Sequence, residues 1–505
     1  MKNVLLIIAV VAFMAGCMKQ KNASMVTTTE KEAWIAQGDL VPVKSTDPAD
    51  AIIDPSKVKQ TIEGFGTCFN ELGWTSLNQL KPEDRESVMK ELFAPGEGAN
   101  FNICRMPIGA NDFSLNWYSY NETDGDFEMT NFSIANDENT LIPFIKNAQK
   151  YNPSIKLWAS PWSPPSWMKY NKHYASRSSA AFLEMIEKMM RDAKPGSGGA
   201  QPVASDMIAT MLDPKYQNDL PKDREGREGT DMFIQDDKYL KAYALYFSKF
   251  IDGYKKEGIN IYAVMPQNEF NSAQNFPSCC WTASGLANFI GKYLGPAMQE
   301  KGVDILFGTM ERPNEALVDT ILNDPFASKF VKGIGFQWAG KDALPGICKR
   351  YPRLTFYQTE QECGDGKNDW KGALHSWDLM KHYLNNGVSV YEYWNTSLVK
   401  GGISRWGWSQ NSLVVVDPES KTYNYTIEYY LLKHMSHFVR PGARKLETDG
   451  EYKDLLAFLN PDKSVVVLIA NQLQTAKVVK IRIGNDTFSA ELKPNSFSTI
   501  TVPSL

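Results

Sequence analysis

Glutamates stand at two places in the sequence where an apolar run gives way to polar residues. Glu360 and Glu362 lie two positions apart in FYQTEQECGDG (356–366), and Glu269 ends NIYAVMPQNE (260–269). Two carboxyl groups that flank one bond are what glycoside hydrolysis needs, because one protonates the leaving oxygen while the other, ionised, attacks the anomeric carbon. A single glutamate at such a place more often forms a salt bridge or caps a loop. Whether these glutamates are catalytic therefore depends on the secondary-structure elements that position them.

Eight apolar, β-rich runs alternate with amphipathic helical stretches from residue 61 onward. They span residues 61–69, 102–109, 155–162, 260–269, 304–311, 332–338, 354–360 and 388–394. A typical linking helix is 237–256, where aromatic residues recur at spacings of four and three (Tyr239, Tyr243, Tyr246, Phe250 and Tyr254) and Gly258 follows. Eight such units predict an α/β fold, a (β/α)8 TIM barrel.

Catalytic groups of a TIM barrel lie at the C-terminal ends of its strands. Glu269 ends the fourth run and Glu360 ends the seventh, so the two carboxyls are expected across the barrel mouth from each other. Other acids in comparable positions compete with them: Glu311, Glu392, Glu71 and Asp112. Spacing alone does not choose among these residues.

The barrel is expected to span residues 61–440 and to be followed by a second domain at 441–505. After about Gly442 the helical patterns stop, and short β-type runs with turn signals predict a small antiparallel β-sandwich, to which 41–60 contributes a strand. Between the third and fourth runs lies a long stretch with KPGSGGAQP (194–202) and KDREGREG (222–229). It is either an insertion on the ligand-binding face or a disordered surface excursion.

The N-terminus has the features of an export signal. One Lys precedes an apolar stretch too short to span a bilayer, and Met-Ala-Gly-Cys follows. We expect a signal peptide at 1–16, lipidation of Cys17 and a flexible tether at 17–40, which is typical of an exported bacterial lipoprotein anchored in the outer membrane, facing the periplasm or the cell surface. The alternative is a plain signal peptide with a chance cysteine.

Composition narrows the class of protein further. The net charge of −4 provides no basic field for nucleic acid, and 13 Trp with 22 Tyr offer flat rings that can stack on sugars. The remaining cysteines have no zinc-site spacing and are expected to be mainly buried thiols, with one disulfide at most (Cys68, Cys104, Cys279, Cys280, Cys348 and Cys363). Only 5 His occur, and the sequence has no HExxH motif. We expect a monomer without metal or organic cofactor, bound to the membrane only through its lipid.

Seven segments, in order, resemble the signature segments of glycoside hydrolase family 30, which includes glucosylceramidases and β-1,6-glucanases. They are EGFGTCFNE, CRMPIGANDFS, ASPWSPPSWMK, QNEF, TEQECGDG, YEYWN and YYLLKHMSHFVRPGARK. The resemblance runs from about residue 60 to the C-terminus, and implies retaining double displacement on a (β/α)8 barrel with a side β-sandwich. It implies that Glu269 is the acid/base, that Asn268 bonds the sugar 2-hydroxyl and that Glu360 is the nucleophile, whereas Glu362 has no assigned role.

The resemblance also implies a set of substrate-binding residues. Arg105 corresponds to the arginine that steadies the nucleophile, and Asp112 to the acid that grips hydroxyls of the nonreducing sugar. Trp162 and Trp394 correspond to aromatic walls of the same subsite. Trp338 is a further candidate at the end of the sixth run, although many relatives carry a His-Trp pair there.

The resemblance favours a β-linked glucan as substrate. FQWAG and TEQECGDGKNDW are more similar to the β-1,6-glucanase branch than to glucosylceramidase, and Phe270 stands where many members have Pro. An endo-β-1,6-glucanase is therefore expected. The alternatives are an exo-acting β-glucosidase, glucosylceramidase or β-xylosidase with the same catalytic residues, and a noncatalytic sugar-binding lipoprotein.

Overall fold

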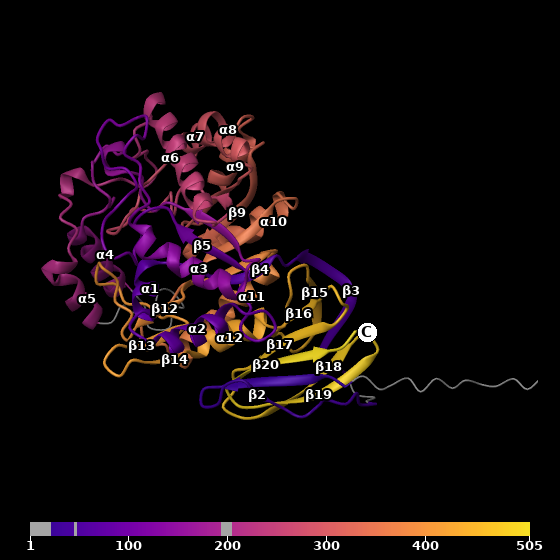
Figure 1. Cartoon of the computed structure of the whole chain (residues 1–505). Coiled ribbons are helices and arrows are strands. Elements are labelled where there is room, and N and C mark those ends of the chain that lie inside the picture. Colours follow the sequence, from indigo (N-terminus) through magenta and orange to yellow (C-terminus); the bar gives the residue numbers. More distant parts are fainter. Residues whose placement is uncertain (1–21, 45–47, 193–204, 505) are drawn as a thin grey trace, which may run out of the picture.

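A computed structural model describes residues 22–44, 48–192 and 205–504. Figure 1 shows a barrel surrounded by helices, with a β-sandwich beside it. The signal peptide, Cys17 and the whole of KPGSGGAQP (194–202) lie outside the described residues. The described helices are α1 (Glu71–Leu77), α2 (Pro82–Phe93), α3 (Leu141–Tyr151), α4 (Ser179–Asp192), α5 (Ser205–Leu212), α6 (Asp237–Lys256), α7 (Ala283–Phe289), α8 (Gly295–Lys301), α9 (Glu315–Asn323), α10 (Leu344–Arg350), α11 (Trp370–Asn385) and α12 (Ile427–Ser436).

Short helical turns link several of these elements: η1 (Asp137–Asn139), η2 (Ser166–Met168), η3 (Pro214–Tyr216), η4 (Lys222–Arg224), η5 (Ile290–Leu294) and η6 (Trp338–Ala343). No helix in the described part of the chain has the length and apolar character needed to cross a membrane. Helix α6 has the predicted bounds. It begins where the Asp236 side chain accepts from the Lys238 N–H, and four of its five predicted aromatic residues are fully buried.

Eight parallel strands close into a barrel in the order β10-β11-β4-β5-β6-β7-β8-β9, which confirms the predicted TIM barrel. They are β4 (Gly64–Cys68), β5 (Ile103–Pro107), β6 (Lys156–Ser160), β7 (Ile261–Val264), β8 (Asp304–Met310), β9 (Val331–Gln337), β10 (Thr355–Glu360) and β11 (Val390–Asn395). Because both faces of such strands are covered, their residues are buried almost throughout, including the polar ones of β10 and β11. The fourth predicted run was too long: β7 ends at Val264, and Glu269 lies in the turn beyond it.

Nine strands form the sheet of the sandwich, in the order β19-β18-β3-β15-β16-β17-β20-β1-β2. They are β1 (Ser24–Thr29), β2 (Ile35–Ala36), β3 (Ala51–Thr61), β15 (Arg444–Gly450), β16 (Leu455–Leu459), β17 (Val465–Asn471), β18 (Lys477–Ile483), β19 (Asp486–Leu492) and β20 (Ser496–Val502). In Figure 1 the indigo β2 and β3 lie among the yellow C-terminal strands. The predicted sandwich and its N-terminal strand are both confirmed.

The predicted tether at 17–40 is wrong over its described part. Strand β1 pairs with β20 from Ser24↔Thr501 to Thr29↔Ser496, and Met25 is buried in the sandwich core. The polar composition misled the prediction, because threonine is β-branched and suits a strand. Buried threonine hydroxyls also find partners: Thr27 bonds Ser498, and Thr28 bonds His434.

The stretch between the third and fourth runs is built into the barrel in its described parts. Helices α4 and α5 share a small apolar cluster of Phe182, Leu183, Ile186 and Met211. Glu225 accepts from the Ser178 N–H at 2.9 Å, which ties KDREGREG to the loop after β6. These contacts favour an insertion that is part of the fold.

A three-stranded sheet follows β11 and was not predicted from the sequence. Its strands are β12 (Ser397–Val399), β13 (Val414–Asp417) and β14 (Thr422–Tyr425).

The cysteines after Cys17 are all free thiols, and every one except the partly exposed Cys348 is buried, as predicted.

Candidate active site

Arg105 lies at the centre of the barrel mouth and is fully buried. It comes from β5, two residues after Ile103, which belongs to the apolar cluster inside the barrel. Its guanidinium donates to Glu360 Oε2 at 2.9 Å, to Asn268 Oδ1 at 2.6 Å and to Ser160 Oγ at 2.9 Å. A buried guanidinium needs such partners, and the carboxylate of Glu360 provides the opposite charge.

Glu360 enters the site because β10 is irregular at its end. Tyr357 belongs to the inner cluster and Thr359 bonds Gln337, so strict alternation would turn Glu360 outward. The pairing register with β9 shifts between Gln358 and Glu360, and Glu360 reaches Arg105. Burial raises the pKa of Glu360, and the Arg105 charge together with donors from Trp338 and Gln337 opposes that rise.

Glu269 faces the same centre from the turn after β7. Its backbone adopts the left-handed region at φ 46°, and its N–H donates to Thr309 Oγ1 at 2.8 Å. The carboxyl accepts from Gln337 Nε2 at 3.0 Å and from Gln274 Nε2 at 3.1 Å. Burial first, and then the charges of Glu311 and Glu360, raise the pKa of Glu269 well above its ordinary value.

Gln337 joins the two glutamates and was missed by the sequence analysis. Its Oε1 accepts from Thr359 Oγ1 at 2.8 Å, which turns its Nε2 toward Glu269 Oε1 at 3.0 Å and Glu360 Oε2 at 3.3 Å. Since one nitrogen contacts both, these two oxygens are at most 6.3 Å apart, the sum of the two distances. The signal was present, because Gln337 is the last residue of β9 and precedes the candidate Trp338.

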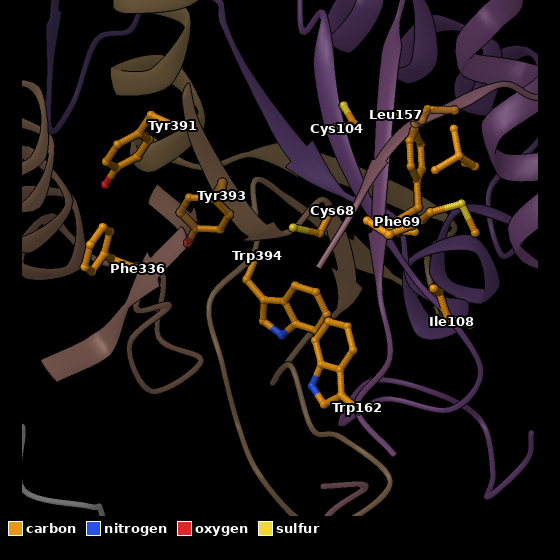
Figure 2. Packing of buried hydrophobic residues seen from close by; sticks show 14 of the residues in the cluster. Cys68, Phe69, Cys104, Ile108, Leu157, Trp162, Phe336, Tyr391, Tyr393 and Trp394 are labelled. Atoms are coloured by element: carbon orange, nitrogen blue, oxygen red, sulfur yellow. The ribbon is translucent and has the colours of Figure 1, made fainter. Parts of the chain in front are cut away.

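Two stacked tryptophans form one side of the site, here named the aromatic wall (Trp162 and Trp394). Their ring centroids lie 5.1 Å apart with an interplanar angle of 26°, and Figure 2 shows them side by side. Trp394 Nε1 donates to Asp112 Oδ2 at 3.3 Å, whereas Asp112 Oδ1 is buried and lacks a hydrogen-bond partner among the described residues. Burial, followed by the charge of Glu360, raises the pKa of Asp112.

The remaining predicted residues also converge here. Asn268 Oδ1 accepts from Arg105 and from Thr309 Oγ1, the latter at 3.1 Å. Trp338 Nε1 donates to Glu360 Oε1 at 3.3 Å, from a backbone at φ 47°. The structure thus brings together all eight substrate-binding and catalytic candidates from the sequence.

Three of the other acids, Glu362, Glu392 and Glu71, have partners away from the two candidate glutamates, whereas Asp112 and Glu311 lie near them. Glu362 pairs with Lys341 at 2.8 Å and with His375 at 2.9 Å, and although burial raises its pKa, these two partners hold the pKa below its ordinary value. Both oxygens of Glu392 accept from Trp158 Nε1 inside the barrel, and Glu71 accepts from the Leu115 N–H as a loop cap. The described residues contain no group of three or more His, Cys, Asp or Glu placed to hold a metal ion.

A closed parallel barrel with two buried carboxyls joined at its mouth is the architecture of a barrel glycoside hydrolase. Residues 62–181 and 222–439 match the glycosyl hydrolase family 30 TIM-barrel domain, and residues 442–500 match the family 30 beta sandwich domain. The chain belongs to glycosyl hydrolase family 30 and is a glycoside hydrolase. The unmatched residues between 181 and 222 include α5 and most of α4.

Glucosylceramidases and endo-1,6-β-glucanases are among the proteins similar to this chain. The chain is 26% identical to the lysosomal acid glucosylceramidase of Mus musculus, over 83% of this chain and 76% of that protein. It is 25% identical to the endo-1,6-β-D-glucanase neg1 of Aspergillus fumigatus, over 88% of this chain and 86% of that protein. The solved structure of the endo-β1,6-glucanase BT3312 superposes with a TM-score of 0.74 at 24% identity and covers 96% of this chain and 99% of that one, which shows the shared fold.

Proposed function

We propose that this glycoside hydrolase works by retaining double displacement, with Glu360 as nucleophile and Glu269 as acid/base. The observation that carries the proposal is the shared contact with Gln337, which limits the facing oxygens to 6.3 Å. Retaining enzymes hold their carboxyls about 5 to 5.5 Å apart, whereas inverting enzymes need about 6.5 to 9.5 Å to admit a water. This upper bound lies below the range for inversion and supports retention.

The different surroundings of the two carboxyls suit the two roles. Arg105 stabilises the ionised form of Glu360, so its oxygen can attack the anomeric carbon. Glu269 has amide donors but no contacting cation, and its raised pKa keeps a proton on it. In the first step the Glu360–sugar bond forms, the glycosidic C–O bond breaks and the Glu269 proton passes to the leaving oxygen. In the second, Glu269 takes a proton from water, which attacks the sugar carbon and releases Glu360.

A covalent intermediate is directly testable. A 2-deoxy-2-fluoro-β-glucoside with a good leaving group should label Glu360, as peptide mass spectrometry would detect, and Glu360→Ala should remain unlabelled. Absence of any label, with no turnover of β-glycosides, would instead support a noncatalytic sugar-binding protein.

The specific substrate that we propose is β-1,6-glucan, which the enzyme cleaves at internal bonds of the polysaccharide. Support comes from the relatives named endo-1,6-β-glucanases, while the similarity to glucosylceramidase at nearly the same identity keeps an exo-acting β-glucosidase, glucosylceramidase or β-xylosidase as the alternative. Product analysis on linear β-1,6-glucan separates these. A mixture of oligosaccharides would support the endo-acting enzyme, and glucose as the sole product would support an exo-acting enzyme. If no product forms, the substrate is a different β-glycoside.

We also propose that the protein is exported and anchored through a lipid on Cys17. If so, the sandwich lies close to the bilayer, because only six positions separate Cys17 from Ala23, which already bonds Leu40. Such a segment spans at most about 22 Å. Incorporation of labelled palmitate that Cys17→Ser abolishes would support the anchor, and incorporation that is unchanged in this variant would refute it.

A further inference from the structure

A cluster of charged side chains beside the turn after β7 is not used by the proposed reaction: Arg312 follows β8, and Arg177 and Glu228 come from the long stretch between β6 and β7. Arg312 comes two residues after β8, pairs with Glu311, and donates from Nη2 to Glu228 Oε1 at 3.1 Å. Arg177 Nη2 lies 3.8 Å from the same Glu228 oxygen. The side chains of Arg312 and Glu228 remain 38% and 35% exposed, so both are accessible to a ligand.

Arg312 and Glu228 are hydrogen-bonded to the segment that carries Glu269. Asn271 Nδ2 donates to the Arg312 carbonyl at 3.2 Å, and the Ala273 N–H donates to Glu228 Oε1 at 3.2 Å. Asn271 and Ala273 come two and four positions after Glu269. Arg312 and Glu228 therefore lie beside the proposed acid/base, on the outer side of its loop.

The leaving group of a glycoside lies on the side of the acid that protonates it. Trp162 and Asp112 follow β6 and β5, and Trp394 lies near the end of β11; these strands are adjacent to one another through β4 in the closed barrel. The attacked sugar is expected against this wall. The turn after β7, with Glu269, and the loop after β8, with Arg312, belong to the opposite half. Glu228 comes from the stretch after β6 and contacts both through Ala273 and Arg312, so the departing residue is expected next to Arg312 and Glu228.

The side chains near the aromatic wall and those beside Glu269 differ in polarity, and this difference indicates the chemical class of the departing residue. Two exposed large hydrophobic side chains, Leu115 and Ile403, follow β5 and β11, on the half of the aromatic wall. Beside the Glu269 segment, Arg312 and Glu228 present a guanidinium and a carboxylate, which recognise hydroxyl groups by charge-assisted hydrogen bonds and are poorly suited to acyl chains.

We propose, resting on the function proposed above, that Arg312 and Glu228 bind the hydroxyls of the glucosyl residue on the leaving side of the cleaved bond. This subsite selects a glucan over a glycoside with a lipid or other apolar leaving group. It contributes to polymer cleavage and not to the chemistry at the attacked sugar.

The test compares two substrates in Arg312→Gln and Glu228→Gln. On linear β-1,6-glucan, loss of one charge-assisted bond should lower kcat/KM by about 10- to 100-fold, mainly through KM. On 4-nitrophenyl β-glucoside, whose leaving group has no sugar hydroxyls, kcat/KM of each variant at its own pH optimum should fall at least about 5-fold less than on the glucan. Arg350→Gln is the matched control, since Arg350 is 41% exposed and likewise bonds two carboxylates, Glu315 and Asp319, but on helices outside the barrel.

Equal losses on both substrates would overturn the subsite and assign Arg312 and Glu228 to holding the insertion in place. Unchanged cleavage of the glucan would overturn it as well. Binding of a β-1,6-linked glucotetraose to Glu269→Gln, measured by calorimetry with and without Arg312→Gln, keeps the test independent of turnover. Weaker binding in the double variant supports the subsite even if the proposed reaction fails, and equal binding rejects it.

Discussion

Replacing Gln337 by methionine tests the shared contact on which the proposed mechanism depends. Methionine has a similar length but cannot donate, so Glu269 keeps only Gln274 as a side-chain donor, while Glu360 keeps Arg105 and Trp338. A hydrogen bond to a charged group contributes about 1.5 to 3 kcal/mol. Part of this remains through the other donors, so we expect kcat/KM at the pH optimum to fall about 10-fold.

The pH profile is the more specific readout of this substitution. Activity requires ionised Glu360 and protonated Glu269, so kcat/KM rises as pH passes the pKa of Glu360 and falls as pH passes the pKa of Glu269. Gln337 donates to both carboxyls and thereby lowers both pKa values. Its removal should move both limbs to higher pH, each by about one unit, since one unit corresponds to about 1.4 kcal/mol.

The assay is hydrolysis of 4-nitrophenyl β-glucoside followed across pH, with thermal unfolding checked in parallel. Gln361→Met provides the matched control. Gln361 is also buried and directly follows Glu360, but it bonds Ser376 and Tyr391, away from both candidate glutamates. Limbs that stay in place in Gln337→Met, or that move to lower pH, would refute the proposed role of Gln337 as the donor shared by the two carboxyls.

Other predictions concern the proposed roles and the corrected N-terminus. Glu360→Ala and Glu269→Gln should each lower kcat by about 1,000-fold or more while the variant remains folded at 25 °C, and undiminished turnover in either variant discards that role. Glu362→Gln should leave kcat within about 3-fold, because Glu362 faces Lys341 and His375; a loss as large as that in Glu360→Ala would reopen the choice between them. Met25→Ala should lower the free energy of unfolding by about 2 to 4 kcal/mol and lower Tm, because Met25 of β1 is part of the sandwich core. Aryl-glucoside activity at 25 °C should stay unchanged. An unchanged Tm would contradict the place of β1 in the core.

The sequence predicted those parts of the fold whose burial is periodic. Strands such as β5 are buried at every residue, and α6 carries a stripe of aromatic residues at helical spacing, so composition and period agree with the fold. Strand β1 was missed because its three threonines are polar. Nothing in the local sequence reveals that β20, more than 460 positions later, supplies the partner strand.

The choice between Glu360 and Glu362 shows where sequence reasoning stops in the active site. Both have the same parity along the chain, so alternation assigns them to the same side of an ideal strand. The register shift at the end of β10 is a property of how β10 pairs with β9, and it directs Glu360 to Arg105. Glu362, beyond the strand, reaches Lys341 and His375; the hydrogen bond with His375 and the Lys341 charge hold the pKa of Glu362 below its ordinary value despite burial. The choice between Glu360 and Glu362 therefore depends on how β10 pairs with β9 in the structure, because this pairing determines which glutamate contacts Arg105.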